Sequence, residues 1–208
     1  MSKSMRKVLL VNIAAAAVTL GLLAAFGGWF RGKDTEPLPV LGQVPDFSLI
    51  ERSGQAVSLA DLKGQVWVAD FVFTHCAGPC PLLSRRMQSL QEPLADHTGV
   101  RLVSFSVDPE RDTPEVLADY AKRYGAGERW LFLTGEKEPL YWLIMDGFKL
   151  GVDDGSALTA GAPGPGTITH STRFVLVDRE GRIRAYYDGS GENIAEQLLP
   201  DIQALLRE

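Results

Sequence analysis

The chain has 208 residues, of which 45% are hydrophobic, so it is long enough for one domain with a single core and a short additional segment. Its formal net charge is -5, and residues 1–30 contain three basic residues and no acidic one, which leaves -8 for the remainder. An acidic body of this kind excludes a nucleic-acid-binding protein, which needs clustered Lys and Arg to contact phosphates.

The first predicted element is a membrane-spanning helix. Residues 8–30 form a run of 23 residues without a charge, and a spanning helix needs roughly 20 such residues. The length favours an uncleaved anchor, while a cleaved signal peptide stays open because Ala24 and Ala25 lie near the end of the run. Basic residues before the span favour a cytoplasmic N-terminus. The chain is therefore expected to be a single-pass protein of the cell inner membrane, with its domain facing the oxidising periplasm.

Residues 31–45 contain three prolines and two glycines and predict a linker. The domain that follows, residues 46–208, is expected to begin with a β-hairpin of residues 46–50 and 55–59. The apolar, β-branched run 65–73 predicts a buried central strand. The later predicted elements are a helix over 81–97, a strand over 100–107, a helix over 114–124, a strand over 130–133, a helix over 139–150, strands over 172–177 and 182–187, and a helix over 193–207.

This order of strands and helices predicts an α/β fold with a mixed central sheet covered by helices on both faces. The expected class is thioredoxin-like, with an N-terminal β-hairpin and a single N-terminal transmembrane helix. The predicted organisation is a cytoplasmic tail and anchor over 1–30, a linker over 31–45 and the thioredoxin-like domain over 46–208.

The only two cysteines, Cys76 and Cys80, lie between the predicted central strand and the next helix. Pro81 suits the first helical position, which predicts Cys80 as the N-cap and an irregular turn before it. Both sulfurs are then expected near the positive end of the helix dipole, where the pKa of a thiol falls and the thiolate is favoured. Such a pair can cycle through a disulfide, bind a soft metal ion, or staple the turn, and a staple of so short a ring adds little stability.

Three histidines are candidates for a further metal ligand. His75 adjoins Cys76, but neighbours in an extended segment point to opposite sides, and His97 suits the dipole at a helix end, so both are interpreted as bystanders. His170 follows a glycine-rich loop and precedes a strand, and on the residues alone its role as a ligand stays open. Two thiolates and one imidazole would form a soft, low-coordinate site that favours copper(I), whereas a structural zinc site needs four ligands.

Three blocks of sequence together resemble the Sco/SenC family of copper-binding proteins, which serve the assembly of cytochrome c oxidase. The run DFVFTHCAGPCP over residues 70–81 resembles the first motif of the family, and SVDPERDTPE over residues 106–115 resembles the second. His170, followed by the strand that ends before Asp178, matches the third. The resemblance implies a thioredoxin-like fold tethered by one N-terminal helix, with Cys76, Cys80 and His170 as copper ligands.

The same resemblance implies a protein that delivers copper, as Cu(I) or Cu(II), to the dinuclear copper centre of cytochrome c oxidase subunit II, or that prepares the thiols of that centre. Other copper or thiol-exchange proteins are the further partners that it implies. The alternative is an enzyme, a thiol–disulfide oxidoreductase in which Cys76 attacks and Cys80 resolves without an obligatory metal. The sequence leaves open whether the chain is an enzyme.

Two features depart from the family pattern or receive no role from it. Residues 77–79 are Ala-Gly-Pro, where many relatives have proline directly after the first cysteine. The segment from Asp108 to Asp112 is interpreted as a turn with ion pairs that leads into a helix capped by Thr113.

Overall fold

The computed structural model describes residues 37–76, 78–153 and 169–208, so the predicted anchor lies outside the described residues. Within these ranges no helix is both long enough and apolar enough to cross a membrane. Residues 38–208 form one compact unit. Its elements are β1 (Gly42–Gln43), β2 (Ser48–Glu51), β3 (Ala56–Ser58), α2 (Leu59–Leu62), β4 (Val66–Val72), α3 (Cys80–Gln91), β5 (Val100–Ser106), α4 (Pro114–Arg123), β6 (Trp130–Thr134), α5 (Lys137–Trp142), the π-helical turn η1 (Leu143–Gly147), β7 (Val152–Asp153), β8 (Thr169–His170), β9 (Arg173–Val177), β10 (Arg182–Asp188) and α6 (Ile194–Arg207).

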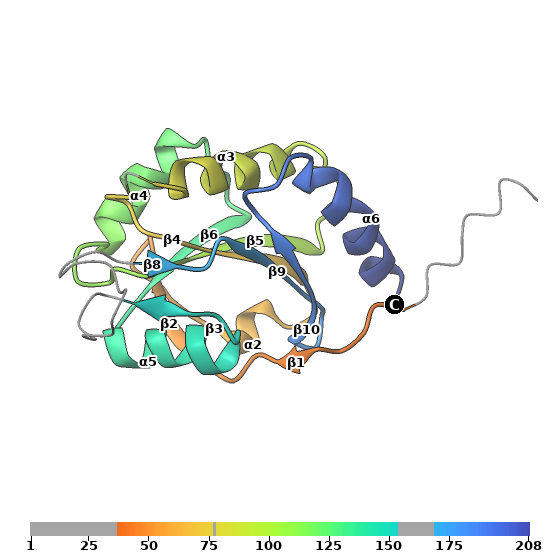
Figure 1. The fold of residues 1–208 in the computed structure, drawn as a ribbon, viewed down its shortest axis with the longest axis horizontal. Coiled ribbons are helices and arrows are strands. Elements are labelled where there is room, and N and C mark those ends of the chain that lie inside the picture. Colours follow the sequence, from red (N-terminus) through yellow and green to blue (C-terminus); the bar gives the residue numbers. More distant parts are fainter. Residues whose placement is uncertain (1–36, 77, 154–168) are drawn as a thin grey trace, which may run out of the picture. The chain divides into compact units, whose positions relative to one another are not determined.

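The main sheet of this unit has eight strands in the order β1-β10-β9-β4-β5-β6-β2-β3 (Figure 1). β4, β5 and β6 are parallel, because α3 and α4 carry the chain back between them, while β9 runs antiparallel to β4. β2 and β3 form the predicted N-terminal hairpin. The mixed α/β, thioredoxin-like fold is therefore confirmed.

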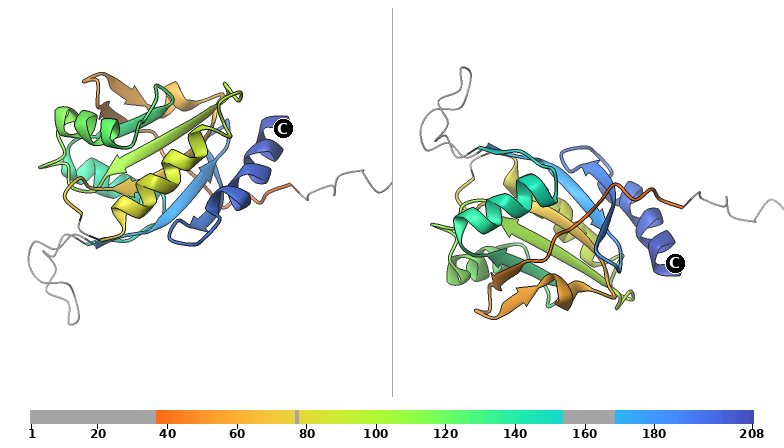
Figure 2. Two further views of the ribbon diagram at one scale, coloured as in Figure 1. Left: turned by 90° about the horizontal axis from the view of Figure 1, so that it is seen from above. Right: turned by 90° about the horizontal axis from the view of Figure 1, so that it is seen from below.

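The strands alternate their side chains between two cores, one on each face of the sheet. On β4, Val68 and Val72 join the core beneath α3, α4 and α6, whereas Trp67 and Phe71 join the core that also contains residues of α2, α5 and η1. Figures 1 and 2 show helices on both faces. Because side chains alternate along a strand, Asp70 lies on the same face as α3.

Element boundaries differ from the prediction where the signal is short or ambiguous. α3 ends at Gln91 rather than near residue 97, and Pro93 lies just beyond this end, where proline cannot donate a helical hydrogen bond. The predicted helix 139–150 is the pair α5 and η1. β1 falls within the segment 31–45 that predicts a linker, and it pairs with β10 at the edge of the sheet. Strands of two residues carry too little periodicity to be found from sequence.

Gly189, just after β10, allows the sheet to approach α3 closely. A Cβ added there would come within 2.6 Å of the Thr172 carbonyl oxygen and 2.8 Å of Leu83 Cδ2. We expect Gly189→Ala to lower the free energy of unfolding by about 1–3 kcal/mol, because overpacking forces the neighbours to move. Denaturant unfolding followed by circular dichroism measures this. The matched control is Gly151→Ala, where the added Cβ meets nothing within 4 Å; equal losses for both variants would contradict the packing argument.

Candidate metal and dithiol site

One edge of the sheet collects the segments that carry the predicted site. The parallel strands β4 and β5 end at this edge, and they are followed by the cysteine turn, residues 73–79, and by the acidic loop, residues 107–113. β9 is antiparallel to β4, so the chain that leads into β9 lies at the same edge. Figures 1 and 2 both show β8 near the N-terminal end of α3. The carboxyl ends of parallel strands are the usual place for ligands in open α/β sheets.

The cysteine turn brings both sulfurs together. α3 starts at Cys80 with Pro79 as its N-cap, so the prediction that Cys80 is the N-cap is wrong by one residue; the Pro79 carbonyl accepts from the N–H groups of Leu82 and Leu83 at 2.9 and 3.0 Å. Cys80 is fully buried, Cys76 is half-buried, and both are present as thiols rather than as a disulfide. The Cys76 side chain lies close enough to Cys80 to affect the pKa of its thiol.

The electrostatics of Cys80 differ from the prediction. Burial is the main cause that raises the pKa of the Cys80 thiol, and the nearby Cys76 thiol raises it further, against a smaller opposing effect of a Phe73 backbone hydrogen bond. The expectation that the helix start favours thiolate is therefore wrong for Cys80. A helix end supplies only about half a charge, whereas removal of water disfavours the full charge of a thiolate. Cys80 therefore stays a neutral thiol unless a cation binds beside it.

His75 and His97 are not brought to the two sulfurs. His75 is exposed, with Nδ1 at 3.0 Å from Thr74 Oγ1, and His97 lies in the turns beyond the far end of α3. In the parts of the chain that the structure describes, no three His, Cys, Asp or Glu side chains form a group able to hold a metal ion.

The backbone of His170 lies in β8, where it pairs with Val152 of β7. β4 and β9 pair with Ala69 opposite Val175 and Trp67 opposite Val177, and the same register continued along both chains would set His170 opposite Thr74. Its side chain lies outside the described residues, so coordination by His170 stays a prediction. The backbone course is compatible with it.

The acidic loop has the predicted form and an additional contact that the sequence analysis missed. Arg111 pairs with Asp108 at 3.2 Å, and Thr113 caps α4 by accepting from Val116 N at 3.4 Å. Asp112, fully buried, reaches across to the cysteine turn and accepts from Thr74 Oγ1 at 2.6 Å. Nothing local in the sequence distinguishes Asp112 from Asp108, because the contact joins residues 38 positions apart.

A second missed group is the buried carboxyl of Asp70, on the face of the sheet that α3 covers. Its Oδ1 accepts from Ser104 Oγ at 2.5 Å, and Ser104 Oγ accepts from Trp130 Nε1 at 2.9 Å. Its Oδ2 is buried without a hydrogen-bond partner among the described residues. Burial raises the pKa of Asp70 to about 7, against the lowering effect of the Ser104 bond. In the sequence, the signal for this group is a charged residue in the middle of an apolar strand.

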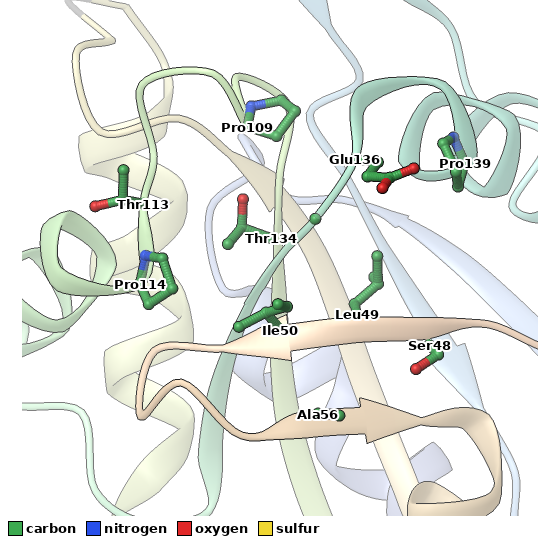
Figure 3. Close-up of a pocket in the computed structure, with 11 residues that line it drawn as sticks. Ser48, Leu49, Ile50, Ala56, Pro109, Thr113, Pro114, Thr134, Glu136 and Pro139 are labelled. Atoms are coloured by element: carbon green, nitrogen blue, oxygen red, sulfur yellow. The ribbon is translucent and has the colours of Figure 1, made fainter.

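A hollow of about 510 Å³ lies beside the acidic loop (Figure 3). Its walls come from β2, from the end of β6 and from Pro109, Thr113 and Pro114 of the loop and the start of α4. Neither cysteine lines it, so the hollow is a neighbour of the site rather than the site itself.

Comparisons with known proteins agree with this arrangement. A family model described as SCO1/SenC matches residues 39–207. The SCO1 protein homolog of Bacillus subtilis (strain 168) is 33% identical over 190 residues, which cover 90% of this chain and 94% of that protein. A putative copper-binding protein of Stutzerimonas stutzeri is 32% identical over 151 residues, covering 72% of this chain and 71% of that protein.

A solved structure shares the fold. It is that of BsSco, described with a disulfide switch and as a member of the Sco family of cytochrome c oxidase assembly proteins; it is 31% identical, with a TM-score of 0.71 over 84% of this chain and 100% of that one. The thiol pair lies where the parallel strands of a thioredoxin-like sheet end, and the family model matches nearly the whole described domain. Together these observations lead to one assignment. This chain belongs to the SCO1/SenC family.

Proposed function

We propose that this chain binds one copper ion through Cys76, Cys80 and His170 and serves the assembly of cytochrome c oxidase. The observation that carries the proposal is the placement of two free thiols, one half-buried and one buried, on the short segment where β4 ends and α3 begins. The names of relatives support it, since one is a putative copper-binding protein and another belongs to a family of oxidase assembly proteins.

The chemistry of the two sulfur donors fits a soft cation. Thiolates select copper(I) among the available metals. Burial holds the Cys80 thiol neutral, and a bound cation reverses this by stabilising the thiolate directly. Copper would therefore displace the thiol protons as it binds, with the imidazole of His170 as the third donor. The ion is cargo, and the protein's own contribution is to hold the two sulfurs within reach of it.

The acceptor we propose is the dinuclear copper centre of cytochrome c oxidase subunit II, reached from a domain held at the periplasmic face of the inner membrane. The support for the tether is the uncharged run of residues 8–30, preceded by three basic residues. A tether confines donor and acceptor to one surface and so raises the effective concentration of each for the other.

Copper stoichiometry tests the proposal. We expect the full chain, purified in mild detergent with its thiols reduced and loaded anaerobically with Cu(I), to retain one copper ion per chain after desalting. The double variant Cys76→Ser/Cys80→Ser should retain none, because hydroxyls are poor ligands for a soft cation. His97→Ala is the matched control and should retain the ion. Full retention by the double variant would contradict the proposal.

A second candidate function is thiol–disulfide exchange, which the unequal exposure of the two sulfurs favours. Cys76, half-buried, can reach a partner disulfide, whereas Cys80 is enclosed. The Cys76 thiolate would attack one partner sulfur and release the other as a thiol. The Cys80 thiolate would then attack Cys76 Sγ and release the second partner thiol. The partner disulfide is reduced by two electrons, and the Cys76–Cys80 pair is oxidised to a disulfide.

Trapping distinguishes this candidate. Cys80→Ser should accumulate a mixed disulfide with a partner in cells, because the second attack is removed. Cys76→Ser, the matched control, should accumulate none, because the remaining thiol is buried. Non-reducing electrophoresis with and without dithiothreitol measures the adduct. An equal yield from the two variants would rule out the assigned roles.

A further inference from the structure

The buried carboxylate of Asp112 ties the acidic loop to the cysteine turn. Thr74 donates to it twice: its hydroxyl reaches Asp112 Oδ1 at 2.6 Å, and its N–H lies 3.3 Å from each carboxylate oxygen. Ser106 Oγ donates to Asp112 Oδ2 at 2.7 Å. One side chain therefore links the turn that follows β4, the last residue of β5 and the acidic loop.

Thr74 stands two residues before Cys76, where the chain has left β4 and has not yet entered α3. Within the turn, Cys76 N donates to the Phe73 carbonyl and Gly78 N donates to Cys76 Sγ, both at 3.3 Å. Thr74 is the residue through which Asp112 ties this turn to the acidic loop. Cys80 is held by a helix, whereas Cys76 is held by the turn. The position of Cys76 relative to Cys80 therefore depends on how firmly Thr74 is fixed.

The acidic loop is a firm base for this contact. Val107 N donates to the Val72 carbonyl at 2.9 Å, and Asp112 N donates to the Asp108 carbonyl at the same distance. Tyr141 of α5 donates its hydroxyl to the Val107 carbonyl at 2.8 Å. Pro109 and Thr113 of the loop line the hollow (Figure 3). Asp112 is not among the lining residues and instead connects the loop to the turn through Thr74.

Burial of a carboxylate between two loops disfavours folding unless hydrogen bonds compensate for it. Burial raises the pKa of Asp112, and nearby Asp108 raises it further, against the lowering effect of the Thr74 and Ser106 bonds. Unpaired burial of a polar group disfavours folding, and here hydrogen bonds to both carboxylate oxygens compensate for it. What this carboxylate provides, and an apolar side chain would not, is a directional hold on Thr74.

We propose that Asp112 is a positioning residue of the dithiol site: through Thr74 it sets the placement of Cys76 Sγ relative to Cys80 Sγ. The assignment rests on the proposed function, since it concerns how the two thiols act together. It deepens that function by giving a role to the motif SVDPERDTPE, residues 106–115, which contains Asp112. Without the Thr74–Asp112 hydrogen bonds, Cys80 Sγ keeps its place at the start of α3, while Cys76 Sγ loses its fixed position.

The test compares Asp112→Ala with a second buried carboxylate, Asp178. Asp178 forms an ion pair with Arg184 at 2.9 Å. It follows Val177, which pairs with Trp67 near the start of β4, so it lies at the opposite end of that strand from the cysteine turn. Asp178→Asn therefore reports the effect of lost stability without a change at the turn. Both variants and the wild-type full chain are measured for Cu(I) affinity by chelator competition, for dithiol–disulfide equilibrium against glutathione, and for thermal unfolding.

We expect Asp112→Ala to weaken Cu(I) binding by roughly 10–100-fold, the range for residues that orient ligands. We also expect Asp112→Ala to change the equilibrium constant between the dithiol and the disulfide, measured against glutathione, about tenfold, which corresponds to about 30 mV in reduction potential. Asp178→Asn should lower the unfolding temperature and leave both readouts within about twofold of wild type. If Asp112→Ala does not fold, Thr74→Val removes the donating hydroxyl alone and should weaken copper binding in the same direction.

Two results would overturn the assignment. One is unchanged copper affinity and unchanged equilibrium in Asp112→Ala or, where that variant does not fold, in Thr74→Val. The other is an equal effect of Asp178→Asn on both readouts. If the wild-type chain binds no copper, the proposed copper function fails by itself, and the glutathione equilibrium still decides the role of Asp112.

Discussion

Replacing His170 with alanine is expected to weaken Cu(I) binding by more than about 100-fold, while both thiols remain oxidisable. Changes to residues that merely orient ligands already cost about 10–100-fold, so loss of a ligand from a three-coordinate site exceeds that range. The backbone of β8 leads into β9, which pairs with β4, and this topology supports the expectation. Competition with a Cu(I)-specific chelator measures the affinity, and a thiol-reactive dye counts the reduced cysteines.

The matched control is His97→Ala. His97 lies beyond the C-terminal end of α3, whereas the sulfurs lie at its N-terminal end. This variant should bind copper with the affinity of the wild type. Cys76→Ser should resemble His170→Ala in affinity but should lose the ability to form the internal disulfide. Equal affinities of His170→Ala and wild type would remove His170 from the ligand set and leave thiol–disulfide exchange as the function that the two cysteines support.

Replacing Asp70 with asparagine is expected to stabilise the protein above pH 7 by up to about 4 kcal/mol. Burial raises the pKa of Asp70 from 3.8 to about 7. Between these two values the unfolded chain has released the proton while the folded protein keeps it, so the stability of the wild type falls as the pH rises through this window. Above about pH 7 the loss is complete. Asparagine cannot ionise, so the variant avoids the loss.

Urea unfolding at several pH values between 4 and 8 checks this expectation, with tryptophan fluorescence as the signal. The wild type should lose stability across that range relative to Asp70→Asn, and the difference should level off at the alkaline end. Asp46→Asn, at an exposed position, is the matched control and should follow the wild-type curve. A constant difference between Asp70→Asn and wild type at every pH would show that the effect is one of packing.

The sheet and its helices were predictable because their signals are local. The apolar run 65–73 contains β4, and Thr113 with Pro114 marks the start of α4, as the structure has them. Errors concentrate where the local signal is weak. The end of α3 was placed too late, and the short strands β1, β7 and β8 were absent from the prediction, because two residues show no periodicity.

The candidate site was predictable in part. The position of Cys76 and Cys80 at a strand–helix junction follows from neighbouring prolines, and the structure has both thiols there. The ionisation of Cys80 was predicted in the wrong direction, because the helix start was visible in the sequence and the burial was not. The sequence indicates only that Asp112 belongs to a turn, because its contact with Thr74 joins residues 38 positions apart.

The sequence by itself determined the order of the main elements, the placement of the thiol pair and the family. The first two depend on residue types within a few positions of one another, where backbone preferences act, and the family depends on three short blocks taken together. Only the tertiary structure decided that Cys80 is a buried neutral thiol, that Asp70 holds its proton up to about pH 7 and that Asp112 holds Thr74. Those properties depend on the exclusion of water and on contacts between distant segments, and neither exists until the chain has folded.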